Sequence, residues 1–427
     1  MTSRRCAGTF VAGLALTVGS FACTGADPPE EPRSTEPSPT PSSRHRAGGT
    51  VTLGVLGEPP TLDPYSPRAT NLTFALLRPV YPSLYRFNQD GTVEADLVES
   101  LVPEPRGGSL ITLKDVTWSD GRPVTASDVL KSIRRARPPS GFAGLRARVR
   151  SKRTLVVSVR DLTRLAGAAF VLPGGRFSRA ISGGPLSLRR YVPGLQLEYV
   201  PNPAWIGGTP SLERVRVQFI NDLDVMLALL RRGKLDAAAP PISVNLDDRL
   251  AAMDLEVDEE LGSEFVGLRL GGPGMDGALA DRIVRALDTR SLAESFARDD
   301  GKMIPPVGRD ERVRSEGPAS VQLAAPEGDE LLILMQEAVQ LQLRRAGIDA
   351  ELITTDMATF YGTWDEDPVA GAALVRGFTR PRNPNPGARV VPLMRVETLL
   401  AWRAGFHGLA ANGTIEGPLW NVEEWSE

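Results

Sequence analysis

Histidine and cysteine, which supply most nucleophilic and metal chemistry in proteins, are scarce in this sequence. The 427 residues contain two histidines, His45 and His407, and two cysteines, Cys6 and Cys23. A Ser-His-Asp arrangement would depend on His407, because His45 lies in a Pro-rich stretch, and no Gly-x-Ser-x-Gly or His-Glu-x-x-His motif accompanies it. We therefore expect no enzyme, no metal and no cofactor, and keep a secreted hydrolase as the weaker alternative.

Two further stretches have residue types that could hold a ligand. Gly272-Pro273-Gly274-Met275-Asp276-Gly277 fits a Gly-x-Gly-x-x-Gly pattern after an expected strand and before an expected helix. A second helix follows, whereas a dinucleotide fold requires a strand that ends in an acid. We interpret this stretch as a crossover loop between two lobes. The acidic run 365–367 is typical of a solvated loop rather than a cation site.

The charge balance and the N-terminus indicate an exported protein that does not bind nucleic acid. Lys and Arg total 49 and Asp and Glu total 52, a net charge of −3 that gives no overall basic field. Arg4 and Arg5 precede a weakly apolar run that ends at Cys23, which predicts a signal peptide over 1–22 and a lipid on Cys23. A signal peptide cleaved elsewhere, with an incidental Cys23, is the alternative. Residues 23–49 are rich in Pro, Ser, Thr and Glu, which predicts an extended tether.

The body of the chain alternates strand and helix patterns. Strands are expected at 50–56, 113–118, 154–159, 195–200, 215–220 and 265–270. Helices are expected at 126–136, 223–232, 279–287, 292–298 and 329–345. Residues 321–354 predict a β-α-β unit with parallel strands and a right-handed crossover. The fold class is therefore α/β.

Several motifs occur in a fixed order between residues 49 and 240. They are Glu58-Pro59-Pro60-Thr61-Leu62-Asp63-Pro64, Val80-Tyr81-Pro82-Ser83-Leu84-Tyr85, Val116-Thr117-Trp118-Ser119-Asp120-Gly121-Arg122-Pro123, Pro201-Asn202-Pro203-Ala204-Trp205-Ile206-Gly207-Gly208 and Gly233-Lys234-Leu235-Asp236. In this order and spacing they resemble the oligopeptide and dipeptide type of extracellular solute-binding protein that serves ABC importers.

The resemblance implies a two-lobed periplasmic-binding-protein-like fold of type II, peptide-binding subclass, with a small domain inserted in lobe one. Lobe one would comprise 50–80, 180–260 and 396–427, the inserted domain 81–179, and lobe two 261–395. Lobe two is expected to be shortened, because the chain passes from Asn383-Pro384 to Val391-Pro392 almost directly.

The resemblance also implies a ligand site between the lobes. Its expected residues are Leu62, Asp63, Tyr65, Tyr81, Ser182, Gly183, Gly184, Arg376, Gly377 and Phe378. Relatives that bind free peptides use an aspartate in lobe two for the terminal ammonium, and the corresponding stretch here, 376–384, has arginines and no acid. This difference favours either an anionic ligand held by Arg376 or Arg380, or arginines that are exposed in a loop.

The function implied is that of a substrate-binding lipoprotein of an ABC importer, which captures a peptide or similar small solute and presents it to the permease. The protein is expected to be a monomer, exported and anchored by its lipid to the outer face of the cell membrane. A sensory or degenerate binding protein that does not transport is the alternative.

Overall fold

The computed structural model describes residues 48–427 apart from 106, 138–139, 244, 297–316, 364–367 and 379–389. Residues from His45 to Glu427 belong to one compact unit. Cys23, Arg380 and the acidic run 365–367 lie outside the described residues. No helix in the described part of the chain is long and apolar enough to cross a membrane.

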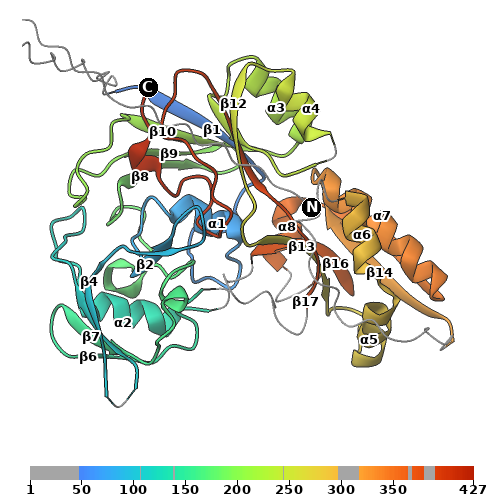
Figure 1. The fold of residues 1–427 in the computed structure, drawn as a ribbon, viewed down its shortest axis with the longest axis horizontal. Coiled ribbons are helices and arrows are strands. Elements are labelled where there is room, and N and C mark those ends of the chain that lie inside the picture. The colour runs from blue at the N-terminus through green and yellow to red at the C-terminus, as the bar shows by residue number, and fades with distance from the viewer. Residues whose placement is uncertain are drawn as a thin grey trace, which may run out of the picture. The chain divides into compact units, whose positions relative to one another are not determined.

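A seven-stranded sheet contains the first and the last strand of the chain (Figure 1). Its order is β12 (Leu255–Glu260), β18 (Thr398–Arg403), β11 (Ala237–Ala239), β1 (Thr50–Leu56), β10 (Arg214–Ile220), β9 (Gln196–Pro201) and β8 (Leu186–Val192). β1 pairs in parallel with both β10 and β11. The interior of β1 is buried, as expected of an apolar central strand. Helices α1 (Asn71–Leu77), α3 (Leu223–Arg231) and α4 (Leu246–Ala251) accompany this sheet.

A five-stranded sheet is built from the later part of the chain. Its order is β15 (Ile348–Thr355), β14 (Ala319–Pro326), β16 (Ala372–Phe378), β13 (Glu264–Leu270) and β17 (Val390–Arg395). β14 and β15 pair in parallel and are joined by α7 (Glu330–Arg345), which confirms the predicted β-α-β unit. Helices α5 (Gly277–Ala286), α6 (Thr289–Phe296) and α8 (Met357–Thr363) complete this part. It has a hydrophobic core of its own, which includes Leu323, Met335 and Leu374.

Smaller sheets lie between α1 and β8 in the chain. β2 (Tyr85–Phe87) pairs with β3 (Val93–Ala95), and a four-stranded sheet has the order β4 (Val98–Pro103), β5 (Ser109–Leu113), β7 (Thr154–Val157) and β6 (Ala147–Val149). Helix α2 (Ala126–Arg135) begins with a capping box between Thr125 and Asp128. Short 3₁₀ turns follow at Leu162–Leu165 and Pro173–Gly175.

Two expectations about local structure are wrong. The strand expected at 113–118 lies earlier, at Ser109–Leu113, because Trp118 is held instead by the turn that Asp120-Gly121 makes, with a bridge between Thr117 and Pro123. The glycine-rich stretch 272–277 does not cross between lobes. It connects β13 to α5 within the five-stranded part, where Gly272 packs against the Ala370 carbonyl group.

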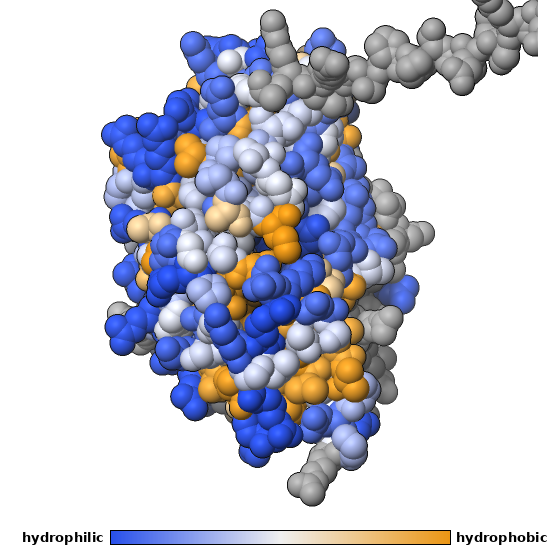
Figure 2. Space-filling view, turned by 90° about the vertical axis from the view of Figure 1, so that its left-hand side faces the viewer, coloured by the Kyte–Doolittle hydropathy of each residue, from blue (hydrophilic) through white to orange (hydrophobic). Residues whose placement is uncertain are grey.

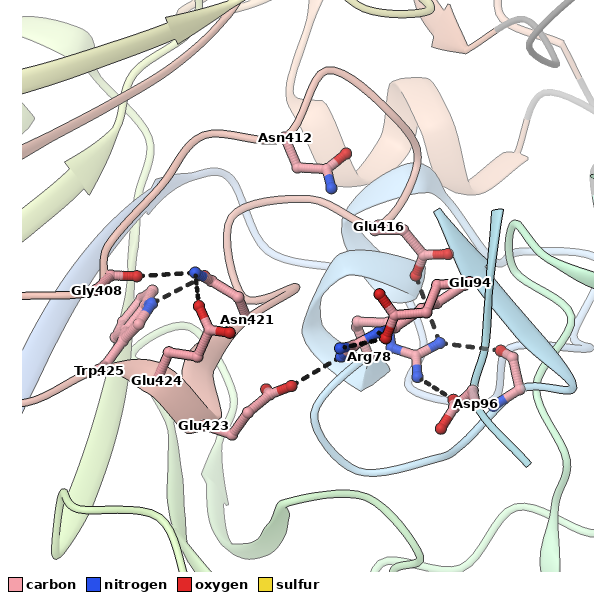
Figure 3. A network of polar contacts seen from close by, with 12 residues as sticks. Arg78, Glu94, Asp96, Gly408, Asn412, Glu416, Asn421, Glu423, Glu424 and Trp425 are labelled. Carbon is pink, nitrogen blue, oxygen red and sulfur yellow. Dashed lines mark hydrogen bonds and ion pairs between the residues drawn. The ribbon is translucent and has the colours of Figure 1, made fainter. Parts of the chain in front are cut away.

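The C-terminal segment after β18, residues 404–427, packs back on the first third of the chain (Figure 3). Buried Arg78 pairs with Asp96 at 2.6 Å and with Glu416 at 3.4 Å, and Arg86 pairs with Glu423 at 2.7 Å. A short 3₁₀ turn at Val422–Glu424 precedes Trp425, which is fully buried. The pairs of Arg78 with Glu416 and of Arg86 with Glu423 join segments more than 300 positions apart in sequence.

The surface shows no broad apolar face in the view of Figure 2, where hydrophilic residues separate the hydrophobic ones into groups. The most exposed large hydrophobic side chains, Val102, Leu195 and Ile206, belong to different strands and loops. Single exposed apolar residues of this kind are normal for a water-exposed protein.

Candidate functional site

The carboxyl ends of the parallel strands in the two large sheets meet at a common boundary. β1, β10 and β11 are parallel in one sheet, and β14, β15 and β16 in the other. Contacts join the residues at or after these strand ends. Gly57 and Gly328 lie close to the other sheet: a Cβ on Gly57 would lie 3.5 Å from the Cβ of Met357, and a Cβ on Gly328 would lie 2.4 Å from the Asn221 carbonyl oxygen. Arg376 donates to the Ile242 carbonyl oxygen at 2.9 Å. Ligands of α/β proteins bind at such edges, which makes this boundary the candidate site.

Arg376 is the centre of a buried charge cluster at this boundary. Its Nε donates to Asp329 Oδ2 at 2.6 Å and its Nη2 donates to Asp329 Oδ1 at 3.0 Å, which is a bidentate pair. Glu264 Oε1 lies 3.6 Å from Arg376 Nη1. The side chains of Arg376, Glu264 and Asp329 are 12%, 13% and 2% exposed. The guanidinium group is therefore occupied by partners within the protein.

Burial and mutual charge shift the ionisation of this cluster. Burial alone would lower the pKa of Arg376, but the carboxylates of Asp329 and Glu264 outweigh it, so its pKa is raised and the cation persists. Burial raises the pKa of Glu264, and Arg376 offsets this only in part. Burial likewise raises the pKa of Tyr361 on α8, with a smaller contribution from Asp329. The cluster therefore has no net positive charge to offer an anion.

The segment that follows β11, residues 240–243, forms the opposite wall. The carbonyl oxygen of Ile242 accepts the hydrogen bond from Arg376. Next to it, Ser243 is 7% exposed, and its Oγ has no hydrogen-bond partner among the described residues. A buried hydroxyl group without a partner costs on the order of 1–3 kcal/mol. A polar atom of a molecule bound at the boundary would remove this cost.

A second polar group follows β1 at the same edge. Glu58, the neighbour of Gly57, accepts hydrogen bonds from the Tyr191 hydroxyl group at 2.5 Å and from the Gly194 amide at 2.8 Å. Burial and the adjacent Glu58 raise the pKa of Tyr191 to about 12. The Arg179 guanidinium lies 5.4 Å from the centre of the Tyr191 ring. Glu58 and Tyr191 therefore present a fixed acceptor and an aromatic surface next to the boundary.

Two segments connect the sheets and could act as hinges. One runs from β12 to β13 through Gly262, and the other runs from β17 to β18. Arg395 Nε donates to the Gly262 carbonyl oxygen at 3.1 Å, and the Ser263 amide donates to the Gly413 carbonyl oxygen at 2.5 Å. A Cβ on Gly262 would lie 1.9 Å from that same Gly413 oxygen. The C-terminal segment thus lies directly against one connection.

Several residues predicted to bind ligand lie instead where α1, the smaller sheets and β8 join. Tyr65 and Tyr81 are buried and donate to the carbonyl oxygens of Phe170 and Ser178. Ser182 Oγ lies 2.6 Å from Ser187 Oγ. Leu62 is buried in the large core, Gly183 packs on Trp118, and Gly184 packs on the Pro79 carbonyl group. Asp63 pairs with Arg135 at 2.7 Å.

The remaining predicted residues, Arg376, Gly377 and Phe378, form a second group at the end of β16, which lies at the candidate site. Among the described residues, no hydrogen bond or ion pair joins the two predicted groups. Arg376 lies in a strand, buried, and not in an exposed loop. The residues that sequence reasoning missed are Glu58, Ser243, Glu264, Asp329 and Tyr361. Asp329 was predicted only as the first residue of the helix 329–345, and its pairing with Arg376 spans 47 positions.

Comparison with known proteins agrees with this architecture. Residues 93–286 match the sequence model of bacterial extracellular solute-binding proteins, family 5, middle region. The chain is 29% identical over 253 residues to the probable D,D-dipeptide-binding periplasmic protein DdpA of Escherichia coli strain K12, which covers 52% of this chain and 48% of that protein. The chain thus aligns with about half the length of this relative.

Solved structures extend the likeness to most of the chain. The oligopeptide-binding protein AppA of Bacillus subtilis, in complex with a nonapeptide, has a TM-score of 0.72 at 14% identity, with 90% of this chain and 99% of that chain covered. NikZ of Campylobacter jejuni, in complex with Ni(L-His), has a TM-score of 0.70 at 17% identity, with 88% and 99% covered. The chain thus has the two-lobed, type II fold of periplasmic binding proteins, and its residues 93–286 match the model of bacterial extracellular solute-binding proteins, family 5.

Proposed function

We propose that this protein captures a small solute between its two large sheets and presents it to an ABC permease. The observation that carries the proposal is the boundary where the carboxyl ends of both parallel strand sets meet, where the Arg376 cluster contacts Ile242 and the buried Ser243 follows next in the chain. Two connecting segments allow the sheets to open and close as rigid bodies about hinges, which is how such proteins enclose ligands. The fold and the matched family are those of substrate-binding proteins and not of enzymes.

The ligand that fits best is a peptide or a similar small solute with a neutral or cationic group at the Arg376 cluster. Arg376 is neutralised by Asp329 and faces Glu264 as well, so an anion would have to displace a carboxylate. This argues against an anionic ligand held by Arg376, one of the two alternatives that the sequence leaves open. The ligands of similar proteins, a nonapeptide for AppA and Ni(L-His) for NikZ, are consistent with amino-acid chemistry but differ in size.

The proposed site of action is the outer face of the cell membrane. The predicted signal peptide, the lipid on Cys23 and the tether 23–49 would keep the body near a permease while it reorients. The alternative function, sensing through a membrane partner without transport, uses the same site and differs in the partner. Hydrolysis would require His407, which lies in the C-terminal segment, where its backbone pairs with Ser426.

The test is a thermal-shift and calorimetric titration of the full chain carrying Cys23→Ser, which prevents acylation. Dipeptides to pentapeptides, each with its N-acetylated form, are compared, because a ligand of the folded state raises the melting temperature. We expect free peptides to bind and acetylation to weaken them. The absence of a shift across the panel, from protein with a cooperative melt, would overturn the proposal in favour of the sensory or degenerate alternative.

Ser243→Ala locates the site within the same experiment. Because its hydroxyl group has no partner among the described residues, we expect Ser243→Ala to preserve stability and to weaken binding by about five- to tenfold, the value of one hydrogen bond. Ser109→Ala is the matched control, since its buried hydroxyl group donates to the Val159 carbonyl oxygen, far from the boundary. It should lower stability and leave affinity unchanged. The reverse pattern would place the ligand elsewhere.

A further inference from the structure

A pocket of about 580 Å³ lies away from the sheet boundary, between the loop after β1 and the C-terminal end of α2. It is lined by Asp63, Tyr65, Ser66, Pro67, Arg134, Arg135, Ala136 and Arg137. Three of these eight residues are arginines, and Asp63 is the only acid. None of the residues of the Arg376 cluster, the Ser243 wall or the Glu58 group lines it. The pocket is therefore a separate feature of the molecule.

The pocket lies in a strongly basic part of a chain that is acidic overall. Residues 131–164 contain eleven Lys and Arg and one acidic residue, Asp161, whereas the whole chain has a net charge of −3. Lys131 is exposed and packs against Gly175, whose neighbour Arg176 is also exposed. The segment that supplies the pocket's arginines is therefore basic in sequence, in a chain that is acidic overall.

The three arginines differ in what holds them. Arg135 pairs with Asp63 at 2.7 Å and donates to the Gly175 carbonyl oxygen at 3.2 Å, so its position is fixed. Arg134 and Arg137 are exposed, and in the described part of the chain neither has a carboxylate within ion-pair distance. Asp63 neutralises one arginine, which leaves two guanidinium groups with all their donors available.

Compensation of the helix dipole explains only part of this arrangement. Arg134 and Arg135 lie in the last turn of α2, where cations are favourable. Arg137 lies beyond the C-cap residue Ala136, whose backbone is already extended, and it still lines the same pocket. The floor is rigid, because the buried Tyr65 donates to the Phe170 carbonyl oxygen. The chain thus brings three arginine residues to the lining of one hollow.

We propose that this pocket binds a phosphate group through Arg134 and Arg137, with the immobilised Arg135 as its wall. Guanidinium groups match the oxygens of a phosphate in bidentate geometry, and two unpaired cations balance its charge of about −2. The phosphate could belong to a soluble ion or to a lipid headgroup. This inference is independent of the proposed solute binding at the sheet boundary.

The test is a titration of the full chain carrying Cys23→Ser with inorganic phosphate at low ionic strength, followed by calorimetry and by ³¹P NMR. Arg134→Gln combined with Arg137→Gln should weaken phosphate binding by about tenfold or more. The matched control is Arg146→Gln combined with Arg148→Gln, which removes the same charge from exposed residues of the same basic region outside the pocket. It should change the affinity by less than about twofold, a small long-range effect.

A second arm of the test distinguishes the source of the phosphate. Co-sedimentation with vesicles of phosphatidylglycerol and phosphatidylcholine is compared for the two double variants. Binding that is lost in the pocket variant and competed by inorganic phosphate assigns a lipid headgroup, whereas pocket-dependent phosphate binding without it assigns a soluble ion. Equal weakening in both double variants, or no phosphate binding by the folded parent, would overturn the proposal. All the substituted residues are exposed, so circular dichroism should show folded variants.

Discussion

Removing the charge of Asp329 tests whether the Arg376 cluster is held together as described. In Asp329→Asn the side chain keeps its shape and can still cap α7 at the Leu332 amide, since Asn and Asp are equally good N-caps. What is lost is the bidentate carboxylate at 2.6 and 3.0 Å from Arg376, in a pair whose members are 12% and 2% exposed. Breaking such a buried pair from one side costs about 3–5 kcal/mol.

The second carboxylate of the cluster sets where in that range the result should fall. Glu264 lies 3.6 Å from Arg376 Nη1 and can keep the cation partly compensated, so we expect a loss of about 3 kcal/mol in the free energy of unfolding. The assay is equilibrium urea unfolding followed by circular dichroism and by fluorescence, whose coincidence checks that a single transition is measured.

Asp128→Asn is the matched control for this prediction. Asp128 is also a buried aspartate at the start of a helix, and it accepts hydrogen bonds from Thr125 and Gly174, but in the described part of the chain it has no guanidinium partner. It should lose about 1–2 kcal/mol, the value of its hydrogen bonds. If Asp329→Asn loses no more than Asp128→Asn, the buried pair does not have the role assigned to it here.

Three further changes test other parts of the structure. Burial raises the pKa of Glu264 above its ordinary value of 4.5, so the contribution of Glu264 to the free energy of unfolding should fall as pH rises from about 4.5 through the folded-state pKa. Glu264→Gln should flatten this pH dependence in urea unfolding. An unchanged pH profile in the variant would contradict the prediction. Arg376→Lys keeps the charge but loses the bidentate geometry and the hydrogen bond to Ile242 that crosses the boundary between the sheets. We therefore expect the variant to have a larger radius of gyration by X-ray scattering. An identical radius of gyration would argue against this contact as a closing interaction. Gly262→Ala places a Cβ 1.9 Å from the Gly413 carbonyl oxygen and should lower the melting temperature by several degrees. The control Gly277→Ala, whose Cβ meets nothing within 4 Å, should not lower it. Equal melting temperatures of the two variants would refute the close packing of the connection from β12 to β13.

Features that depend on neighbouring residues could be predicted from the sequence. The capping box of Thr125 and Asp128 and the β-α-β unit around α7 are set by local patterns, and the structure has both. The strand expected at 113–118 was wrong because β-rich composition continues past Leu113 into a segment whose Asp120-Gly121 turn prevents ladder pairing. Local propensity marks an element, but turn chemistry and pairing decide its bounds.

The candidate site depends on pairings that no local pattern contains. Arg376 and its three partners, Asp329, Glu264 and Ile242, are between 47 and 134 positions apart. Tyr81 and Ser182 have the residue types of a binding site, yet their hydroxyl groups are used in hydrogen bonds within the protein. Sequence could identify the type of fold and the end of β16, whereas the unpartnered Ser243 hydroxyl group is visible only in three dimensions.

The Arg376 cluster connects the charge of the site with the closing of the sheets. Arg376 is oriented by Asp329, and the same guanidinium group donates across the boundary to the Ile242 carbonyl oxygen. A hydrogen bond to a charged group contributes about 1.5–3 kcal/mol, comparable to the few kcal/mol that separate two conformations of such a protein. In the proposed closure of the sheets, this bond would supply part of the closing free energy before any ligand binds. A ligand that shifts the equilibrium must add contacts that exist only in the closed form, and we propose the hydroxyl group of Ser243, next to Ile242, for one of them.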